Sequence, residues 1–305
     1  MQPRHVLTAL LTSAALLLGG CAGGDDSPGG PASASAGAAY PVTVGDLTLP
    51  QRPTKIVSLS PTATEMLFAV GAGPQVTAVD DQSSYPAEAP RTNLTAFKPS
   101  AEAVAAKNPD LVVLSDDIDK IVDQLRTLEI PVFVTPSAKN LDQTYAQIEQ
   151  LGQLTGHPAE ATALTGRMRA DIDKIAASVP PRKKPLTYYY ELDPTLYTVT
   201  SKTFIGSVLA RLQLTNVADP ADADGSKGGY PQLSQEALVK ANPDVILLAD
   251  SKCCKQSAAT VAARPGWSGI TAVKTGKIVA LDDDIASRWG PRVVDLMRSV
   301  ADATA

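Results

Sequence analysis

The 305-residue chain has few of the side chains that build metal sites and nucleic-acid surfaces. Histidine occurs only twice, whereas a bare zinc or manganese site usually needs several His, Asp or Glu ligands, so no metal site is expected. The formal net charge of -5 argues against a nucleic-acid partner, because nucleic-acid binders usually carry a basic face. The sequence contains no P-loop and no Gly-x-Ser-x-Gly motif, and therefore predicts neither an enzyme nor a cofactor.

Long apolar runs are also lacking, except near the N-terminus. The run VLTALLTSAALLL follows Arg4 and is too short to span a bilayer, but it has the length and position of a secretory signal. It is followed by LGGC, ending at Cys21, which resembles a bacterial lipobox; in such signals the Cys is lipidated and becomes the mature N-terminus. We expect a signal peptide over residues 1–20, a lipid anchor in the membrane at Cys21, and a flexible Gly/Ser/Ala/Pro-rich tether over residues 21–52. The alternative is a plain signal peptide with a chance Cys.

Cysteine is scarce beyond Cys21, since only the adjacent pair Cys253 and Cys254 remains. An exported protein meets oxidising conditions that permit a disulfide, but a bond between neighbours closes a strained ring. Two thiols with no His nearby make an incomplete metal site. The pair is therefore interpreted either as a strained loop disulfide or as two inert thiols, with no catalytic role.

The remaining sequence alternates short apolar runs with amphipathic helical segments. Such alternation predicts an α/β fold with mostly parallel sheets that are covered on both faces. A first lobe is expected over about 54–136 and a second over about 185–305, with a helical linker over about 141–178. The second helix of that linker, about 21 residues or roughly 31 Å long, is long enough to run along both lobes.

One short pattern occurs twice. SAEAVAAKNPDLVVLSDD begins at Ser100 and SQEALVKANPDVILLADS begins at Ser234, with Ser, Glu, Ala, Asn, Pro and Asp at matching positions. Each predicts a helix, a proline break and a buried strand, so the lobes are expected to be similar, with a ligand in the opening between them. Glu102 and Glu236 begin the two helices, where any acid is favoured by the helix dipole, but their matching positions favour a shared function.

Several motifs in order resemble a known family. KIVSLSPTATEMLFAVGAG, SYPAEAP, the two repeated units and DDDIASRWGPR are together similar to the solute-binding proteins of ATP-driven importers for cobalamin and iron complexes, the Fe/B12 periplasmic-binding family. The resemblance implies two Rossmann-like lobes joined by a long backbone helix, with small hinge motion and the ligand between the lobes. It implies an extracytoplasmic lipoprotein that captures cobalamin or a ferric siderophore for an ABC permease dimer with its ATPase. A haem-binding lipoprotein is the alternative, as is, in a different class, a non-transport α/β lipoprotein enzyme.

The same resemblance implies roles for individual residues. Glu102 and Glu236 would each meet an Arg pocket on one copy of the permease. The residues implied at the ligand are Tyr190, Tyr230, Asp284 and Arg288, with Phe97 as a substitute for the large aromatics that are missing at Gln82 and Ala96.

Other interpretations of these residues stay open. Tyr190 would alternatively pack under a helix, and Arg288 would be a solvated surface charge. Trp289 is either a ligand wall or a lid over the last helix. Three cations would serve an anionic ferric siderophore but are otherwise ordinary surface charges: Lys98, Lys202 and Arg292.

Overall fold

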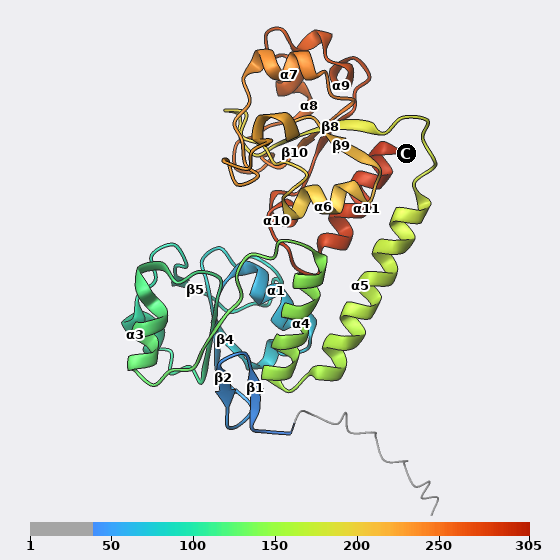
Figure 1. Ribbon diagram of the computed structural model, residues 1–305. Coiled ribbons are helices and arrows are strands. Elements are labelled where there is room, and N and C mark those ends of the chain that lie inside the picture. Colours follow the sequence, from blue (N-terminus) through green and yellow to red (C-terminus); the bar gives the residue numbers. More distant parts are fainter. Residues whose placement is uncertain (1–38) are drawn as a thin grey trace, which may run out of the picture. The chain divides into compact units, whose positions relative to one another are not determined.

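A computed structural model describes residues 39–305 (Figure 1). The predicted signal peptide, the predicted lipid anchor at Cys21 and the predicted tether as far as residue 38 lie outside the described residues. Within residues 39–305 no helix is both long enough and apolar enough to cross a membrane.

The folded part of the chain begins earlier than the sequence analysis predicted. β1 (Val42–Val44) and β2 (Leu47–Leu49) pair as an antiparallel hairpin, and Val44 and Leu49 are buried in the main core. The Tyr40 hydroxyl donates a hydrogen bond of 2.9 Å to the Leu154 carbonyl. The prediction of a flexible tether up to residue 52 is therefore wrong from residue 40 onward, because the apolar side chains of this segment find a place in the core.

The first lobe is built on a five-stranded parallel sheet with the order β5-β4-β3-β6-β7. Every residue of the central strands β3 and β6 is buried, as expected for a parallel sheet that is covered on both faces. The strands are β3 (Ile56–Leu59), β4 (Val76–Asp80), β5 (Arg91–Leu94), β6 (Leu111–Leu114) and β7 (Val132–Val134). The helices are α1 (Pro61–Ala69), α2 (Ala101–Ala105) and α3 (Ile121–Thr127), with short 3-10 turns η1 (Gly73–Gln75) and η2 (Ile118–Lys120).

The second lobe is built on a four-stranded parallel sheet with the order β11-β10-β8-β9. Its strands are β8 (Leu186–Glu191), β9 (Leu214–Asn216), β10 (Val245–Leu248) and β11 (Ile278–Ala280). Its helices are α6 (Phe204–Ala210), α7 (Gln235–Ala241), α8 (Ala258–Ala262), α9 (Thr271–Lys274), α10 (Asp283–Ala286) and α11 (Val293–Thr304), with the turns η3 (Asp219–Asp222) and η4 (Trp267–Gly269). The predicted α/β class with two parallel-sheet lobes is confirmed.

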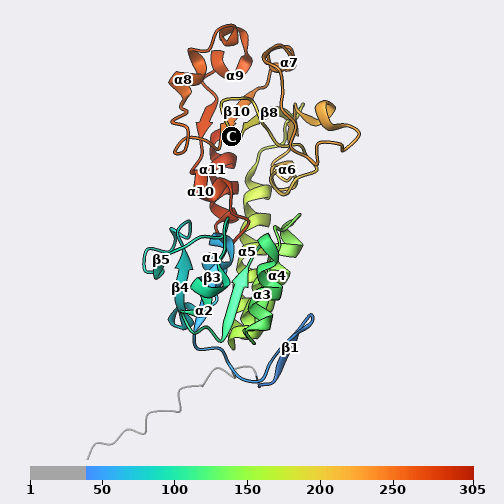
Figure 2. The same cartoon turned by 90° about the vertical axis from the view of Figure 1, so that its left-hand side faces the viewer.

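Two helices connect the sheets. α4 (Leu141–Thr155) ends at Gly156, whose φ of 80° suits a glycine, and α5 (Pro158–Ser178) begins with a proline in its first turn, where the missing N–H is not needed. α4 packs on α5, which then carries the chain alongside both sheets (Figure 1). The C-terminal α11 packs back on α5, and α10 and α11 lie between the two sheets (Figure 2).

The sequence repeat is also a structural repeat. Ser100 and Ser234 each cap their helix by accepting a hydrogen bond from the backbone N–H three residues on, at 3.2 Å and 3.1 Å. Asn108 and Asn242 both adopt the left-handed conformation, with φ of 51° and 48°, which an Asn tolerates better than most residues.

The Asp that follows the proline of each repeat ties it to the neighbouring strand. Asp110 accepts hydrogen bonds from the backbone N–H groups of Thr54 and Lys55 at 2.7 Å and 2.8 Å, and Asp244 accepts one from Thr187 at 2.8 Å. Both carboxylates thus fix the start of a buried strand against its parallel partner, β3 in one lobe and β8 in the other. Equal elements in both lobes place Glu102 and Glu236 at equivalent positions.

Candidate functional site

A cavity of about 350 Å³ lies between the two lobes. The first lobe lines it with polar residues that follow its strands within two positions: Ser60 after β3, Gln82 after β4, Ser115 after β6 and Thr135 after β7. In open α/β sheets the carboxyl ends of the strands form the usual ligand crevice. We call this cavity and its lining the cleft.

The second lobe lines the cleft with the segment that runs from α10 toward α11, namely Asp284, Ser287, Arg288 and Trp289. The ring of Trp289 stacks on Phe204 of α6 at a centroid distance of 4.8 Å, and its carbonyl accepts a hydrogen bond of 3.0 Å from Thr144 of α4. These contacts hold Trp289 as a wall of the cleft.

Arg288 is the most connected side chain of the cleft. It is 8% exposed and donates to Asp284 at 3.0 Å, to Glu65 at 3.1 Å and to the carbonyl of Gln82 at 2.9 Å. The interpretation of Arg288 as a solvated surface charge is therefore wrong. The guanidinium is held by both lobes, and it presents an Asp284–Arg288 pair to the cleft.

Glu65 of α1 is the buried centre of this contact between the lobes, and the sequence analysis missed it. Its side chain is 1% exposed and accepts hydrogen bonds from Arg288 and from Arg292, the latter through Nε at 2.8 Å and through Nη2. The hydrogen bonds that Arg292 donates to Glu65 outweigh burial and raise the pKa of Arg292. Its guanidinium also lies 4.2 Å from the Tyr85 ring centroid. The available signal was an acid within an otherwise apolar helix, because a buried Glu needs a partner.

Of the other predicted cations, Lys98 is exposed and does not line the cleft. Lys202 donates to the backbone carbonyls of Asp222 and Ala223 at 3.3 Å and 3.2 Å, so its charge is already solvated by the protein. The predicted aromatic Phe97, unlike these two lysines, lines the cleft. Its ring is 76% exposed and also lines an adjoining apolar hollow of about 110 Å³.

The two predicted tyrosines do not lie at the cleft. Tyr190 is 0% exposed, and its hydroxyl donates to the Ala286 carbonyl at 3.1 Å. The prediction that Tyr190 faces the ligand is wrong, because β8 is central in its sheet and is covered on both faces. Tyr230 is 45% exposed on the loop after two glycines, away from the cleft lining, and its ligand contact stays a prediction.

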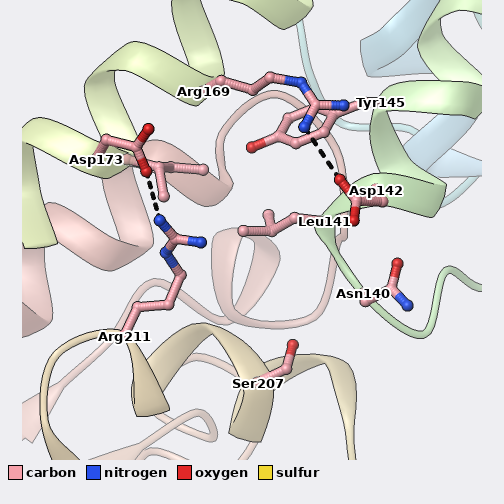
Figure 3. A pocket seen from close by; sticks show the side chains of 9 residues that line it. Asn140, Leu141, Asp142, Tyr145, Arg169, Asp173, Ser207 and Arg211 are labelled. Carbon is pink, nitrogen blue, oxygen red and sulfur yellow. Dashed lines mark hydrogen bonds and ion pairs between the residues drawn. The ribbon is translucent and has the colours of Figure 1, made fainter.

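A second hollow, of about 380 Å³, lies beside α4, α5 and α6 (Figure 3). Its two arginines are already paired: Arg169 with Asp142 at 3.0 Å and Arg211 with Asp173. Tyr145 lies under Arg169, 3.9 Å from ring centroid to guanidinium carbon. Exposed ion pairs of this kind contribute little and leave no cation free, so the cleft is the better candidate site.

Glu102 and Glu236 lie in the first turns of α2 and α7, where the sequence analysis placed them. Both side chains are exposed, and neither makes an ion pair with another part of the described chain. They are therefore available to a partner, which is what a docking role requires.

A buried carboxyl pair lies at the ends of β8 and β10 in the second lobe. Glu191 and Asp250 are both 0% exposed; Arg264 binds Glu191 through two hydrogen bonds of 2.6 Å and 2.5 Å, whereas neither oxygen of Asp250 has a hydrogen-bond partner in residues 39–305. Burial and the neighbouring charge of Glu191 raise the pKa of Asp250 to about 7. Below about pH 7, Asp250 is thus protonated beside Glu191.

Asp250→Asn is expected to stabilise the protein at pH 8 and not at pH 4. Because the pKa of Asp250 in the folded protein is raised, its favourable contribution is complete below about pH 4 and is lost as the pH rises toward 7. At pH 8 the free energy of unfolding of the variant, measured in urea, should exceed that of the wild type by on the order of 2 kcal/mol, since the amide replaces a buried charge. An equal gain at both pH values, or the same gain in the exposed control Asp46→Asn, would contradict the assignment.

Comparison with known proteins extends what the geometry shows. Residues 56–285 match the periplasmic binding protein family. The chain is 30% identical to an ABC transporter substrate-binding lipoprotein of Bacillus subtilis, YvrC, over 99% of this chain and 98% of the relative. It is 32% identical to a cobalamin-binding protein of Halobacterium salinarum, over 89% of this chain and 76% of the relative.

A solved structure gives a similar result at the level of the fold. The periplasmic haem-binding protein RhuT from Roseiflexus sp. RS-1 superposes with a TM-score of 0.72 and 25% identity, covering 82% of this chain and 97% of that one. Two parallel-sheet lobes joined by α5, a polar cleft at their strand ends, and matches over nearly the whole chain all agree with the resemblance found in the sequence. The chain therefore belongs to the periplasmic binding protein family.

Proposed function

We propose that this protein is the extracytoplasmic substrate-binding component of an ABC importer, and that it captures cobalamin in the cleft. The observation that carries the proposal is the cleft itself, formed at the carboxyl ends of the first sheet and closed by α10 and Trp289, in a chain 32% identical to a cobalamin-binding protein. As a binding protein it would hold its ligand without chemical conversion.

The chemistry of the cleft supports a neutral ligand that is rich in hydrogen-bonding groups. The lining offers hydroxyl and amide side chains, the aromatic rings of Phe97 and Trp289, and a single ion pair whose charges cancel. Cobalamin combines peripheral amide groups with a broad ring face. The cavity and the adjoining hollow are smaller than a corrinoid, so part of the ligand would project beyond them.

Ferric siderophores and haem are the competing ligands. An anionic siderophore would be favoured by unpaired cations, but the one guanidinium among the cleft residues is bound to two carboxylates. Haem iron is usually held by His, Tyr, Cys or Met, and none of these lines the cleft in the described part of the chain. Against each of these two competitors, the residues that line the cleft favour cobalamin.

The protein would be anchored to the membrane and would deliver its ligand to a permease. Lipidation at Cys21, after removal of residues 1–20, would hold the protein at the outer face of the membrane near its permease. Glu102 and Glu236 would dock on the two halves of a permease dimer with its ATPase. The lobes would extend over about 54–136 and 185–305, joined by α4 and α5.

A ligand panel tests the proposed cargo. Purified protein is titrated with cyanocobalamin, several ferric siderophores and haemin while Trp fluorescence is followed, because Trp289 lies on the cleft wall. We expect saturable quenching by cyanocobalamin at one ligand per protein. Tight binding of a siderophore or of haemin in its place would overturn the choice of ligand but not the role as a receptor.

A further inference from the structure

Cys253 and Cys254 lie in the loop between β10 and α8, and the proposed function makes no use of them. Both are free thiols; Cys253 is exposed, Cys254 is half-buried, and their Sγ atoms are 2.6 Å apart. Among residues 39–305 they are the only cysteines, so each has the other as its only thiol neighbour. The family acts outside the cytoplasm, where thiols meet oxidants.

The loop that carries the pair is fixed at both ends. On one side the backbone carbonyl of Asp250 accepts a hydrogen bond of 3.2 Å from the N–H of Cys254. On the other side the Asp283 carboxylate accepts from the N–H groups of Lys252 and Cys253, both at 2.9 Å. These donors outweigh burial and hold the pKa of Asp283 below its usual range. Asp283 opens α10, so the loop and α10 are joined by charge-assisted hydrogen bonds.

α10 leads directly into the cleft. The ammonium group of Lys252 lies 2.8 Å from Asp282 and 3.2 Å from Asp284, and Asp284 in turn pairs with Arg288. A change in the backbone at Cys253 therefore reaches a cleft residue through Asp283 and through Lys252.

We propose that Cys253 and Cys254 form a reversible redox site that takes small-molecule disulfides as its oxidant and that adjusts the cleft through Asp283 and Asp284. The Cys254 thiolate attacks the external disulfide, forms a mixed disulfide and releases one thiol. The Cys253 thiolate then attacks the Cys254 sulfur, closes the ring and releases the second thiol. The protein is oxidised by two electrons, the external disulfide is reduced, and the two protons leave on the two released thiols.

The environment of the pair favours reversibility. Partial desolvation, the contact with Cys254 and the Asp283 charge raise the pKa of Cys253 to about 12, so this thiol is protonated at neutral pH and reacts second. A disulfide between adjacent residues is strained, and strained exposed disulfides are the ones that reductants open easily. Closing the ring reorients the peptide group between the two residues, which carries the N–H of Cys254, so we expect its hydrogen bond to the Asp250 carbonyl to be lost. The neighbouring N–H of Cys253 then shifts against Asp283, and its hydrogen bond weakens.

The test treats the full-length protein with glutathione disulfide and follows the peptide that contains residues 253–254 by mass spectrometry. We expect loss of two hydrogens with no glutathione attached, reversal by dithiothreitol, and, in Cys253→Ser, a trapped glutathione adduct on Cys254 instead. Two unreacted thiols, or a stable adduct on the wild-type protein, would overturn the redox site.

Coupling to the cleft rests on the proposed function and has its own readout. The affinity for the ligand selected by the panel should be about three- to tenfold lower in the oxidised protein than in the reduced protein, as expected when one charge-assisted hydrogen bond that supports α10, from Cys253 to Asp283, is weakened. The double variant Cys253→Ser/Cys254→Ser should bind equally in both conditions. Ring closure with unchanged affinity would refute the coupling, and the thiol chemistry is measured whichever ligand the cleft takes.

Discussion

Replacing Glu65 by alanine is expected to lower the free energy of unfolding by about 3–5 kcal/mol, because removing one partner of a buried ion pair leaves a charge uncompensated. Glu65 is 1% exposed at its side chain and is bound to two guanidinium groups, which are 10% and 15% exposed. Arg288 would keep Asp284, but Arg292 would lose its only carboxylate among the described residues.

The same substitution should loosen the two lobes from one another. Glu65 belongs to α1 of the first lobe, whereas Arg288 and Arg292 come from the segment that flanks α11 in the second. Urea unfolding measures the decrease in the free energy of unfolding, with Asp46→Ala as the control. Asp46 forms an exposed ion pair of 3.2 Å with Arg126, so replacing it should lower the free energy of unfolding by less than about 1 kcal/mol. A loss below 1 kcal/mol for Glu65→Ala would show that the contact between the lobes is not held in this way.

Reversing both exposed acids of the repeat, as Glu102→Arg with Glu236→Arg, is expected to reduce ligand uptake by cells about tenfold or more while leaving ligand binding unchanged. Opposed charges at the rim of an interface fix register and speed association, and like charges repel. The two residues lie at equivalent positions of the two lobes, so a two-fold permease would lose both contacts at once.

A matched variant separates this effect from net charge. Glu88→Arg with Glu129→Arg changes the charge by the same amount at two other exposed acids, and it should transport normally. Uptake of labelled ligand is measured in cells that carry the permease and ATPase but lack the wild-type receptor. Normal uptake by the Glu102/Glu236 variant would remove the docking role and leave the cleft assignment intact.

The sequence predicted those parts of the fold that depend on local patterns. The helix, the proline break and the buried strand of each repeat are local signals, and the sequence predicts them in both copies. Five short elements were missed, β5, β9, α8, α9 and α10, because three to five residues give no period that can be recognised. The sequence predicts a flexible tether where the hairpin β1–β2 lies. The two strands are short, and the hairpin is stabilised by contacts with α4 and not by a pattern in its own sequence.

The site was predicted only in part, because long-range pairing decides which polar groups meet. Asp284 and Arg288 are four residues apart, so their contact could be predicted from helical spacing, and it forms at 3.0 Å. The partner of Arg288 in the first lobe, Glu65, is 223 residues away, and no local pattern links the two. Tyr190 was wrongly predicted to face the ligand for a related reason. The alternation of side chains along a strand shows which residues share a face, but it does not show whether helices cover that face.

Binding of cyanocobalamin to a protein whose cleft is blocked tests the central claim most directly. Ser115 lines the cleft after β6, and Ser115→Trp would fill part of the cavity, whereas Ser178→Trp adds the same ring at the exposed end of α5. In equilibrium dialysis the wild type and Ser178→Trp should each bind one cyanocobalamin, and Ser115→Trp should bind about 100-fold more weakly or not at all. Equal affinity of all three proteins, or no binding by the wild type, would contradict the account.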